Sequence, residues 1–204
     1  MSATAAPGVS DRSDFRTVTI GGAKIGALTA VAVVLFLAVS RFVPPTGGMR
    51  GGIEALIVLA AGAAVTFLPA QWTAARQVEG IAGAAAIGLV GTVVFTAIDI
   101  VVFRPLKAYP WTWDAIGGGS TWWYLPVWWM LGTFVAWMGG VVTAAGGSGE
   151  ATRSRRALPA VAATIILATV ARLAGVPVAF PVATGAAFTL ALAALALVAL
   201  ARKG

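Results

Sequence analysis

Long apolar runs separated by short polar breaks dominate this chain. Each run is continuous rather than alternating, which favours membrane-spanning helices over the strands of a barrel. A polar tail at residues 1–24 precedes the first run. The spans expected from hydropathy are residues 25–43, 53–68, 81–103, 122–142, 158–173 and 178–201. The pattern predicts an all-α integral membrane protein, a single bundle of about six transmembrane helices over residues 25–201.

Two of these runs raise a question about the number of spans. The final apolar stretch, residues 157–201, is about twice as long as one crossing needs, so it should fold back once. Gly175, Pro177 and Pro181 mark the expected turn. The second run, 53–68, is short and stops at Pro69. Five spans plus a re-entrant second segment is therefore the alternative to six.

The lysines and arginines predict an orientation. With six spans, nine of them fall on the side of the two termini and five on the other side. Positively charged loops stay in the cytoplasm, so both termini are expected there, in a bacterial-type inner membrane. The aromatic, glycine-rich loop at residues 104–121 would then be extracytoplasmic.

Composition supports lipid as the solvent and narrows the chemistry. Hydrophobic residues make up 59% of the chain and charged residues 10%, whereas a soluble domain carries about a quarter charged residues. The chain has no cysteine and no histidine, so the sequence predicts no metal and no cofactor held by side-chain ligation. The net charge of +7 is scattered among short loops. This scatter indicates topology signals and anionic lipid headgroups as partners, and not nucleic acid.

Small residues recur every four positions in the third and fourth runs. In lipid, helices associate where small side chains let their backbones approach closely. Both stripes are therefore predicted helix-packing faces, although a chain rich in glycine and alanine also produces such spacings by chance. The stripes are Gly80, Ala84, Gly88 and Thr92 in the third run, and Gly132, Ala136 and Gly140 in the fourth.

Asp99 is the carboxylate placed deep in an apolar run. An acid at the centre of a membrane helix costs about 2.5–3.5 kcal/mol, so a partner is expected. Arg41 and Arg172 come at a similar depth by residue count. Arg172 is the preferred partner, because Arg104, five residues after Asp99, would point about 140° away on an α-helix. A structural ion pair, a ligand or ion site, and an interfacial residue remain open for Asp99.

Seven of the eight tryptophans lie between residues 111 and 137. Aromatic rings gather at membrane–water interfaces, which accounts for most of them. At 100° per residue, however, Trp122, Trp129 and Trp137 share one helix face, with Trp128 beside it. This aromatic wall would pack on neighbouring helices, or would bind a flat apolar molecule such as a quinone, a carotenoid or a lipid.

Three functions follow from these features. The leading hypothesis is a non-catalytic integral membrane subunit that packs within a larger membrane protein complex, in contact with lipids and other subunits. The alternative is a small membrane carrier or receptor for an apolar or anionic ligand, with the Trp-lined site near the outer leaflet. The third is an enzyme that acts on lipid through Asp99 and Asp114, for which the chain offers no further recognisable catalytic residues.

Overall fold

The computed structural model describes residues 13–108, 124–146 and 157–202. Over these ranges the chain is helical. Five helices, counting α3 together with η2, are long and apolar enough to cross a membrane, and α7 is a shorter apolar helix. The predicted all-α, membrane-type fold is confirmed. The elements are α1 (Phe15–Phe42), η1 (Thr46–Gly48), α2 (Met49–Trp72), α3 (Val78–Ile98), η2 (Asp99–Phe103), α5 (Tyr124–Ala145), α7 (Ala157–Leu173) and α8 (Phe180–Ala201).

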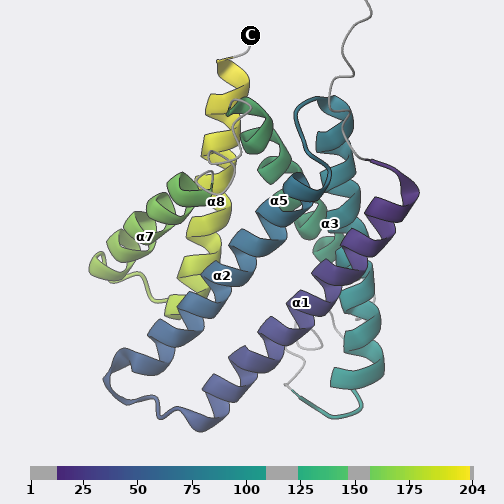
Figure 1. Cartoon of the computed structure of the whole chain (residues 1–204). Coiled ribbons are helices and arrows are strands. Elements are labelled where there is room, and N and C mark those ends of the chain that lie inside the picture. Colours follow the sequence, from purple (N-terminus) through teal and green to yellow (C-terminus); the bar gives the residue numbers. More distant parts are fainter. Residues whose placement is uncertain (1–12, 109–123, 147–156, 203–204) are drawn as a thin grey trace, which may run out of the picture.

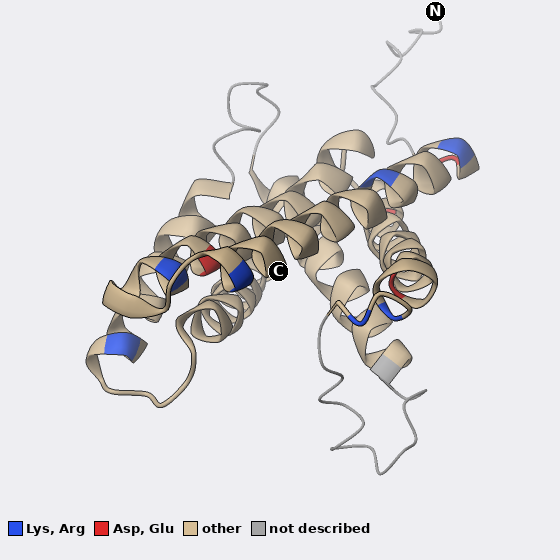
Figure 2. Cartoon of the chain, turned by 90° about the horizontal axis from the view of Figure 1, so that it is seen from below, with Lys and Arg blue, Asp and Glu red and all other residues tan. Residues whose placement is uncertain are grey.

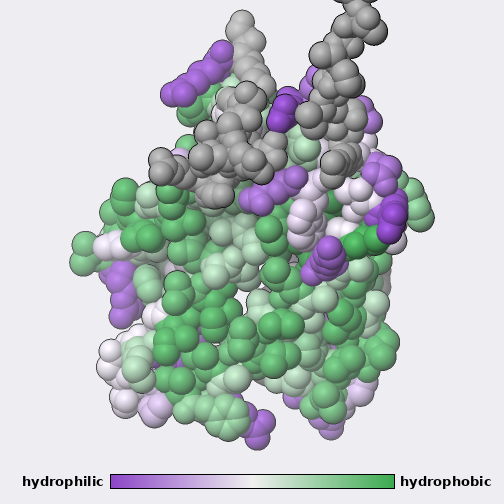
Figure 3. Space-filling view, in the orientation of Figure 1, coloured by the Kyte–Doolittle hydropathy of each residue, from purple (hydrophilic) through white to green (hydrophobic). Residues whose placement is uncertain are grey.

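The described helices form one bundle in which α2 contacts the most other helices. Helix α3 packs against α1 on one side and α5 on the other, α2 contacts α1, α5 and α8, and α7 packs mainly on α8. Figure 1 shows the first turn of α1 and the last turn of α8 at the same end of the bundle. Apolar side chains cover most of the face seen in Figure 3, and its hydrophilic residues gather mostly towards that same end.

Helix α1 begins at Phe15 and not at Ile25, where the apolar run begins. Asp14 explains the earlier start, because its carboxylate accepts hydrogen bonds from the backbone N–H of Thr17 at 3.0 Å and from the Thr17 hydroxyl at 2.6 Å. These bonds satisfy a free N–H of the first turn and hold the pKa of Asp14 below its ordinary value. Residues 15–24, expected as part of a polar tail, are therefore helical.

Helix α2 is longer than its apolar core, since it runs from Met49 through Pro69 to Trp72. Together with η1 it is long and apolar enough to cross a membrane. Thr73 completes the helix end: its backbone N–H donates to the carbonyl of Pro69 at 3.0 Å. Its buried hydroxyl lies 2.9 Å from the carbonyl of Gly80 and so links the end of α2 to the start of α3.

Among the helices that the structure describes, α7 is the short apolar one. Its 17 residues span about 25 Å, less than the roughly 30 Å of a hydrocarbon core. The turn after it contains Gly175 in the left-handed conformation, with φ of 70°, which glycine adopts without strain. Pro181 then lies in the first turn of α8, where its missing N–H leaves no hydrogen bond unmade.

Candidate functional site

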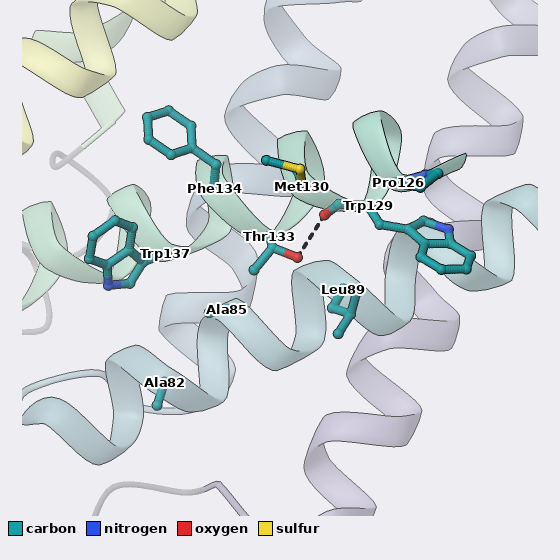
Figure 4. A pocket seen from close by; sticks show the side chains of 9 residues that line it. All are labelled: Ala82, Ala85, Leu89, Pro126, Trp129, Met130, Thr133, Phe134 and Trp137. Atoms are coloured by element: carbon teal, nitrogen blue, oxygen red, sulfur yellow. Dashed lines mark hydrogen bonds between the residues drawn. The ribbon is translucent and has the colours of Figure 1, made fainter. Parts of the chain in front are cut away.

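An apolar groove of about 710 Å³ opens on the surface between α3 and α5. In Figure 4, α3 contributes small and aliphatic side chains to one side, and α5 contributes the aromatic ones. The groove is lined by Ala82, Ala85, Leu89, Pro126, Trp129, Met130, Thr133, Phe134 and Trp137.

Close packing of two glycine-containing faces fixes the distance between α3 and α5. A Cβ atom added to Gly88 would lie 2.5 Å from the carbonyl oxygen of Gly132 and 2.6 Å from Cβ of Ala136. A Cβ added to Gly132 would overlap Cγ2 of Thr92. The two backbones are therefore in contact, as small residues permit between membrane helices.

The rest of the two predicted stripes continues this contact. A Cβ added to Gly140 would lie 3.3 Å from Cα of Ile81 and 3.6 Å from Cβ of Ala84. Ala84 and Ala136 are fully buried. Gly80 lies at the α2 end of the stripe, where its carbonyl faces Thr73. The structure thus brings the two predicted faces against each other, whereas the sequence left their partners open.

The aromatic wall consists of two of the four tryptophans proposed for it. Trp129 and Trp137 both line the groove from α5. Trp128 is exposed and does not line it. Trp122 lies outside the residues that the structure describes.

Three lining side chains carry a polar atom: Trp129, Thr133 and Trp137. The Thr133 hydroxyl donates to the backbone carbonyl of Trp129 at 2.7 Å, the dashed line of Figure 4. The indole Nε1 of Trp129 is buried and has no hydrogen-bond partner among the described residues. A buried donor without an acceptor costs free energy. Protein atoms cover this nitrogen, so it does not face the open groove.

A second glycine contact, between α1 and α3, is absent from the sequence prediction. Gly22 and Gly26 lie so close to Val90 and Val94 of α3 that an added Cβ would come within 2.7 Å of each valine side chain. In return, a Cβ on Gly91 would lie 2.6 Å from Cγ2 of Ile25. The Gly-x-x-x-Gly spacing of Gly22 and Gly26 is the sequence signal that would have identified this face.

Asp99 pairs with Arg104 and not with Arg172. Its carboxylate is buried, and Oδ2 lies 3.6 Å from the Arg104 Nε. The pairing is possible because η2 is a π-helical turn, in which the backbone N–H of Arg104 donates to the carbonyl of Asp99 at 2.9 Å. A π-turn places residue i+5 back above residue i, so the expected angle of 140° between these side chains does not apply.

The other two arginines proposed for this site lie elsewhere. Arg41 is exposed in the last turn of α1. Arg172 is exposed in the last turn of α7, the helix that packs mainly on α8. Figure 2, which looks at the bundle from below, shows the charged residues in separate groups rather than as one cluster. Among the described residues, neither Arg41 nor Arg172 forms an ion pair with Asp99.

Glu54 is a buried charge that the sequence analysis did not use. Its Oε1 accepts hydrogen bonds from the Ser40 hydroxyl at 2.6 Å and from the Arg50 Nε at 2.9 Å. Arg50 precedes it by four residues on α2, and Ser40 comes from α1, so the cluster joins the two helices at the end where the chain turns. The i, i+4 spacing of Arg50 and Glu54 was a readable signal of this ion pair.

Fold and groove together define an all-helical protein with several helices long and apolar enough to cross a membrane. Comparison with known proteins adds no family: no family model matches the chain, and neither the curated proteins nor the solved structures contain a significant match.

Proposed function

We propose that this protein is a non-catalytic, multi-pass membrane protein that binds an elongated apolar molecule in the groove between α3 and α5. The observation that carries the proposal is the groove of about 710 Å³ with Trp129 and Trp137 along one side. Its volume falls within the roughly 300–1,000 Å³ typical of small-molecule sites, which are mostly apolar and aromatic.

The construction of the groove suits a binding role. Its side on α3 carries Ala82 and Ala85, whose small side chains leave the volume open. Its side on α5 is held in place because Gly132 of α5 lies against the backbone of α3 at Gly88. A site whose walls are already fixed loses less conformational entropy when a ligand binds.

A second candidate function, a subunit of a larger membrane complex, is supported by the same face of α3. Ala82 is exposed and Ala85 is partly exposed. Small residues on the outer face of a membrane helix are where a partner helix packs most closely. In this case the groove would receive a transmembrane helix of another subunit.

We further propose six crossings, α7 included, with both termini in the cytoplasm of a bacterial-type cell. The positions of the first turn of α1 and the last turn of α8 at one end of the bundle support an even number of crossings. Arg16, Lys24, Arg76 and Arg202 belong to that side, which supports its assignment to the cytoplasm.

One experiment tests both functions. The protein is purified in mild detergent, and native mass spectrometry and solvent extraction identify what stays bound. Ala85→Phe fills the groove, and Ala162→Phe, at an exposed position on α7, is the matched control. We expect one apolar molecule per chain in the wild type and in Ala162→Phe, and none in Ala85→Phe.

A partner protein that is lost only in Ala85→Phe would instead establish the subunit function. If neither a molecule nor a protein depends on Ala85, the groove is not a binding site, and both functions are refuted.

A further inference from the structure

We infer that α7 thins the bilayer beside it, so that phospholipid headgroups of the leaflet on the side of the termini reach the first turn of this helix. The surface concerned is the exposed face of that turn, at Leu158 and Pro159. The inference goes beyond the α3/α5 groove, and it rests on the proposed six crossings.

Helix α8 marks the two surfaces of the bilayer. Its 22 residues, Phe180–Ala201, include no charged side chain, and they rise about 33 Å. This rise matches a hydrocarbon core of about 30 Å. Phe180 therefore lies at the surface opposite the termini, and Arg202, which follows the helix, lies at the surface on the side of the termini.

Helix α7 shares the first of these surfaces with α8 but does not reach the second. Residues 174–179 join the two helices, and they are exposed and not helical. Such backbone does not occur in contact with hydrocarbon, so this turn lies at the surface. Helix α7 has 17 residues against 22 in α8, a deficit of about 8 Å. It also lies obliquely against α8 and runs along only part of its length, which shortens its rise further (Figure 1).

The first turn of α7 therefore lies at a depth that hydrocarbon would fill in a bilayer of even thickness. The first backbone N–H groups of a helix have no acceptor within it, and hydrocarbon offers no water to satisfy them. Leu158 is 59% exposed, so protein does not enclose this turn. The sequence agrees, because Arg155 and Arg156 directly precede the helix, and arginine is costly in hydrocarbon.

Thinning is the response that fits this helix. A short membrane helix is accommodated by bilayer thinning, by snorkelling side chains or by association with a partner. Snorkelling does not help backbone N–H groups, because they cannot move to the surface. At Leu158, Ile165 and Ile166 the exposed face of α7 carries large aliphatic side chains, whereas membrane helices associate closely through small ones.

Single cysteines test the depth directly, because the chain has no cysteine of its own. Leu158→Cys reports on the first turn of α7, 15 residues before Leu173. Ala194→Cys is the matched control, since it is exposed on α8 and lies 14 residues after Phe180. In nanodiscs of dioleoylphosphatidylcholine, we expect a water-soluble maleimide to label Leu158→Cys and to leave Ala194→Cys unlabelled. Only the thiolate reacts, and apolar surroundings suppress it.

Two further measurements identify headgroups as the cause and remove the dependence on variants. A bimane label is attached to each cysteine before reconstitution with phosphatidylcholine that carries a nitroxide on its headgroup. Quenching should be strong at residue 158 and weak at residue 194. In the wild-type protein in nanodiscs, the amides of Leu158 and Ala160 should exchange with deuterium at close to the intrinsic rate, because water reaches them.

Sealed vesicles separate this inference from the proposed crossings. Ala145→Cys and Ala174→Cys flank α7, and a membrane-impermeant maleimide should reach them from opposite sides. Labelling of both from one side would refute the six crossings and this inference together.

The remaining outcomes concern the thinning alone. Opposite labelling, combined with equal reactivity of Leu158→Cys and Ala194→Cys or with protected amides at residues 158 and 160, would overturn the thinning and keep the six crossings. Labelling of Leu158→Cys without quenching by the headgroup nitroxide would show that water arrives through a cavity in the protein, and this would also overturn it. Neither result affects the binding of an apolar molecule in the α3/α5 groove.

Discussion

Replacing Gly132 with alanine tests the backbone contact between α3 and α5. The new Cβ would overlap Cγ2 of Thr92 and lie 3.3 Å from the carbonyl oxygen of Gly88. Neither neighbour moves easily. Thr92 is stiff at χ1, and its hydroxyl lies 3.0 Å from the Gly88 carbonyl oxygen. The helices must therefore separate, and overpacking of this kind costs about 1–3 kcal/mol.

Part of that cost is offset, because alanine is a better helix former than glycine by about 0.5–1 kcal/mol. We expect a net loss of about 1–2 kcal/mol in the free energy of unfolding, measured by titrating SDS into mild-detergent micelles and following the helical signal.

Two other glycines serve as graded controls. A Cβ at Gly52 meets nothing within 4 Å, so Gly52→Ala should be neutral or slightly stabilising. A Cβ at Gly140 would lie 3.3 Å from backbone Cα of Ile81, so Gly140→Ala should fall between the other two variants. If Gly132→Ala unfolds at the same SDS concentration as Gly52→Ala, the backbone contact between α3 and α5 does not exist as described.

Three further predictions concern charged groups. Glu54→Ala leaves its arginine partner unpaired and should lower the free energy of unfolding by about 2 kcal/mol in the same SDS titration. This is less than the roughly 3–5 kcal/mol of a fully buried pair, because that arginine side chain is 33% exposed. An unchanged midpoint of the titration would contradict this prediction. Asp99→Asn should lower the melting temperature. Adding Arg104→Gln should restore part of the loss, whereas adding Arg172→Gln should not. If only Arg172→Gln restores the melting temperature, the pairing of Asp99 with Arg104 is wrong. The pKa of Asp14 is lowered in the folded protein, so its capping contribution is present above the pKa of the unfolded chain and is lost as the pH falls through the folded value. On acidification, amide exchange in the first turn of α1 should therefore accelerate relative to the intrinsic rate in the wild type but not in Asp14→Ala. Equal pH profiles in the two proteins would refute the capping role of Asp14.

Helical periodicity correctly predicted that two tryptophans of the groove share a helix face, but it did not predict the ion pair of Asp99. Residues 129 and 137 share a face at 100° per residue, and α5 is a regular α-helix over both, so the rule holds. The same rule fails from Asp99 to Arg104, because η2 is a π-turn. The local sequence does not predict the π-turn, because the residues between Asp99 and Arg104 are apolar and fit an α-helix equally well.

Hydropathy also misjudged helix lengths, for a physical reason. It measures which residues prefer lipid, whereas a helix continues as far as its backbone hydrogen bonds and caps allow. Asp14 therefore starts α1 well before the apolar run, and α2 continues through Pro69. Capping residues were visible in the sequence, but an apolar scan gives them no weight.

The glycine contacts connect the stability of the bundle with the shape of the groove. Helix α3 touches α1 through Gly91 and α5 through Gly88, on two different faces. On a third face of α3, Ala82 and Ala85 line the groove. Because both neighbours meet α3 at backbone distance, α3 cannot shift towards either one to close the groove. A Cβ at Gly132 would therefore change more than stability: by moving α5 outward it would also move Trp129 away from Ala85. Gly132→Ala should widen the groove and weaken retention of the proposed apolar molecule, while the equally small change Gly52→Ala should leave its retention intact.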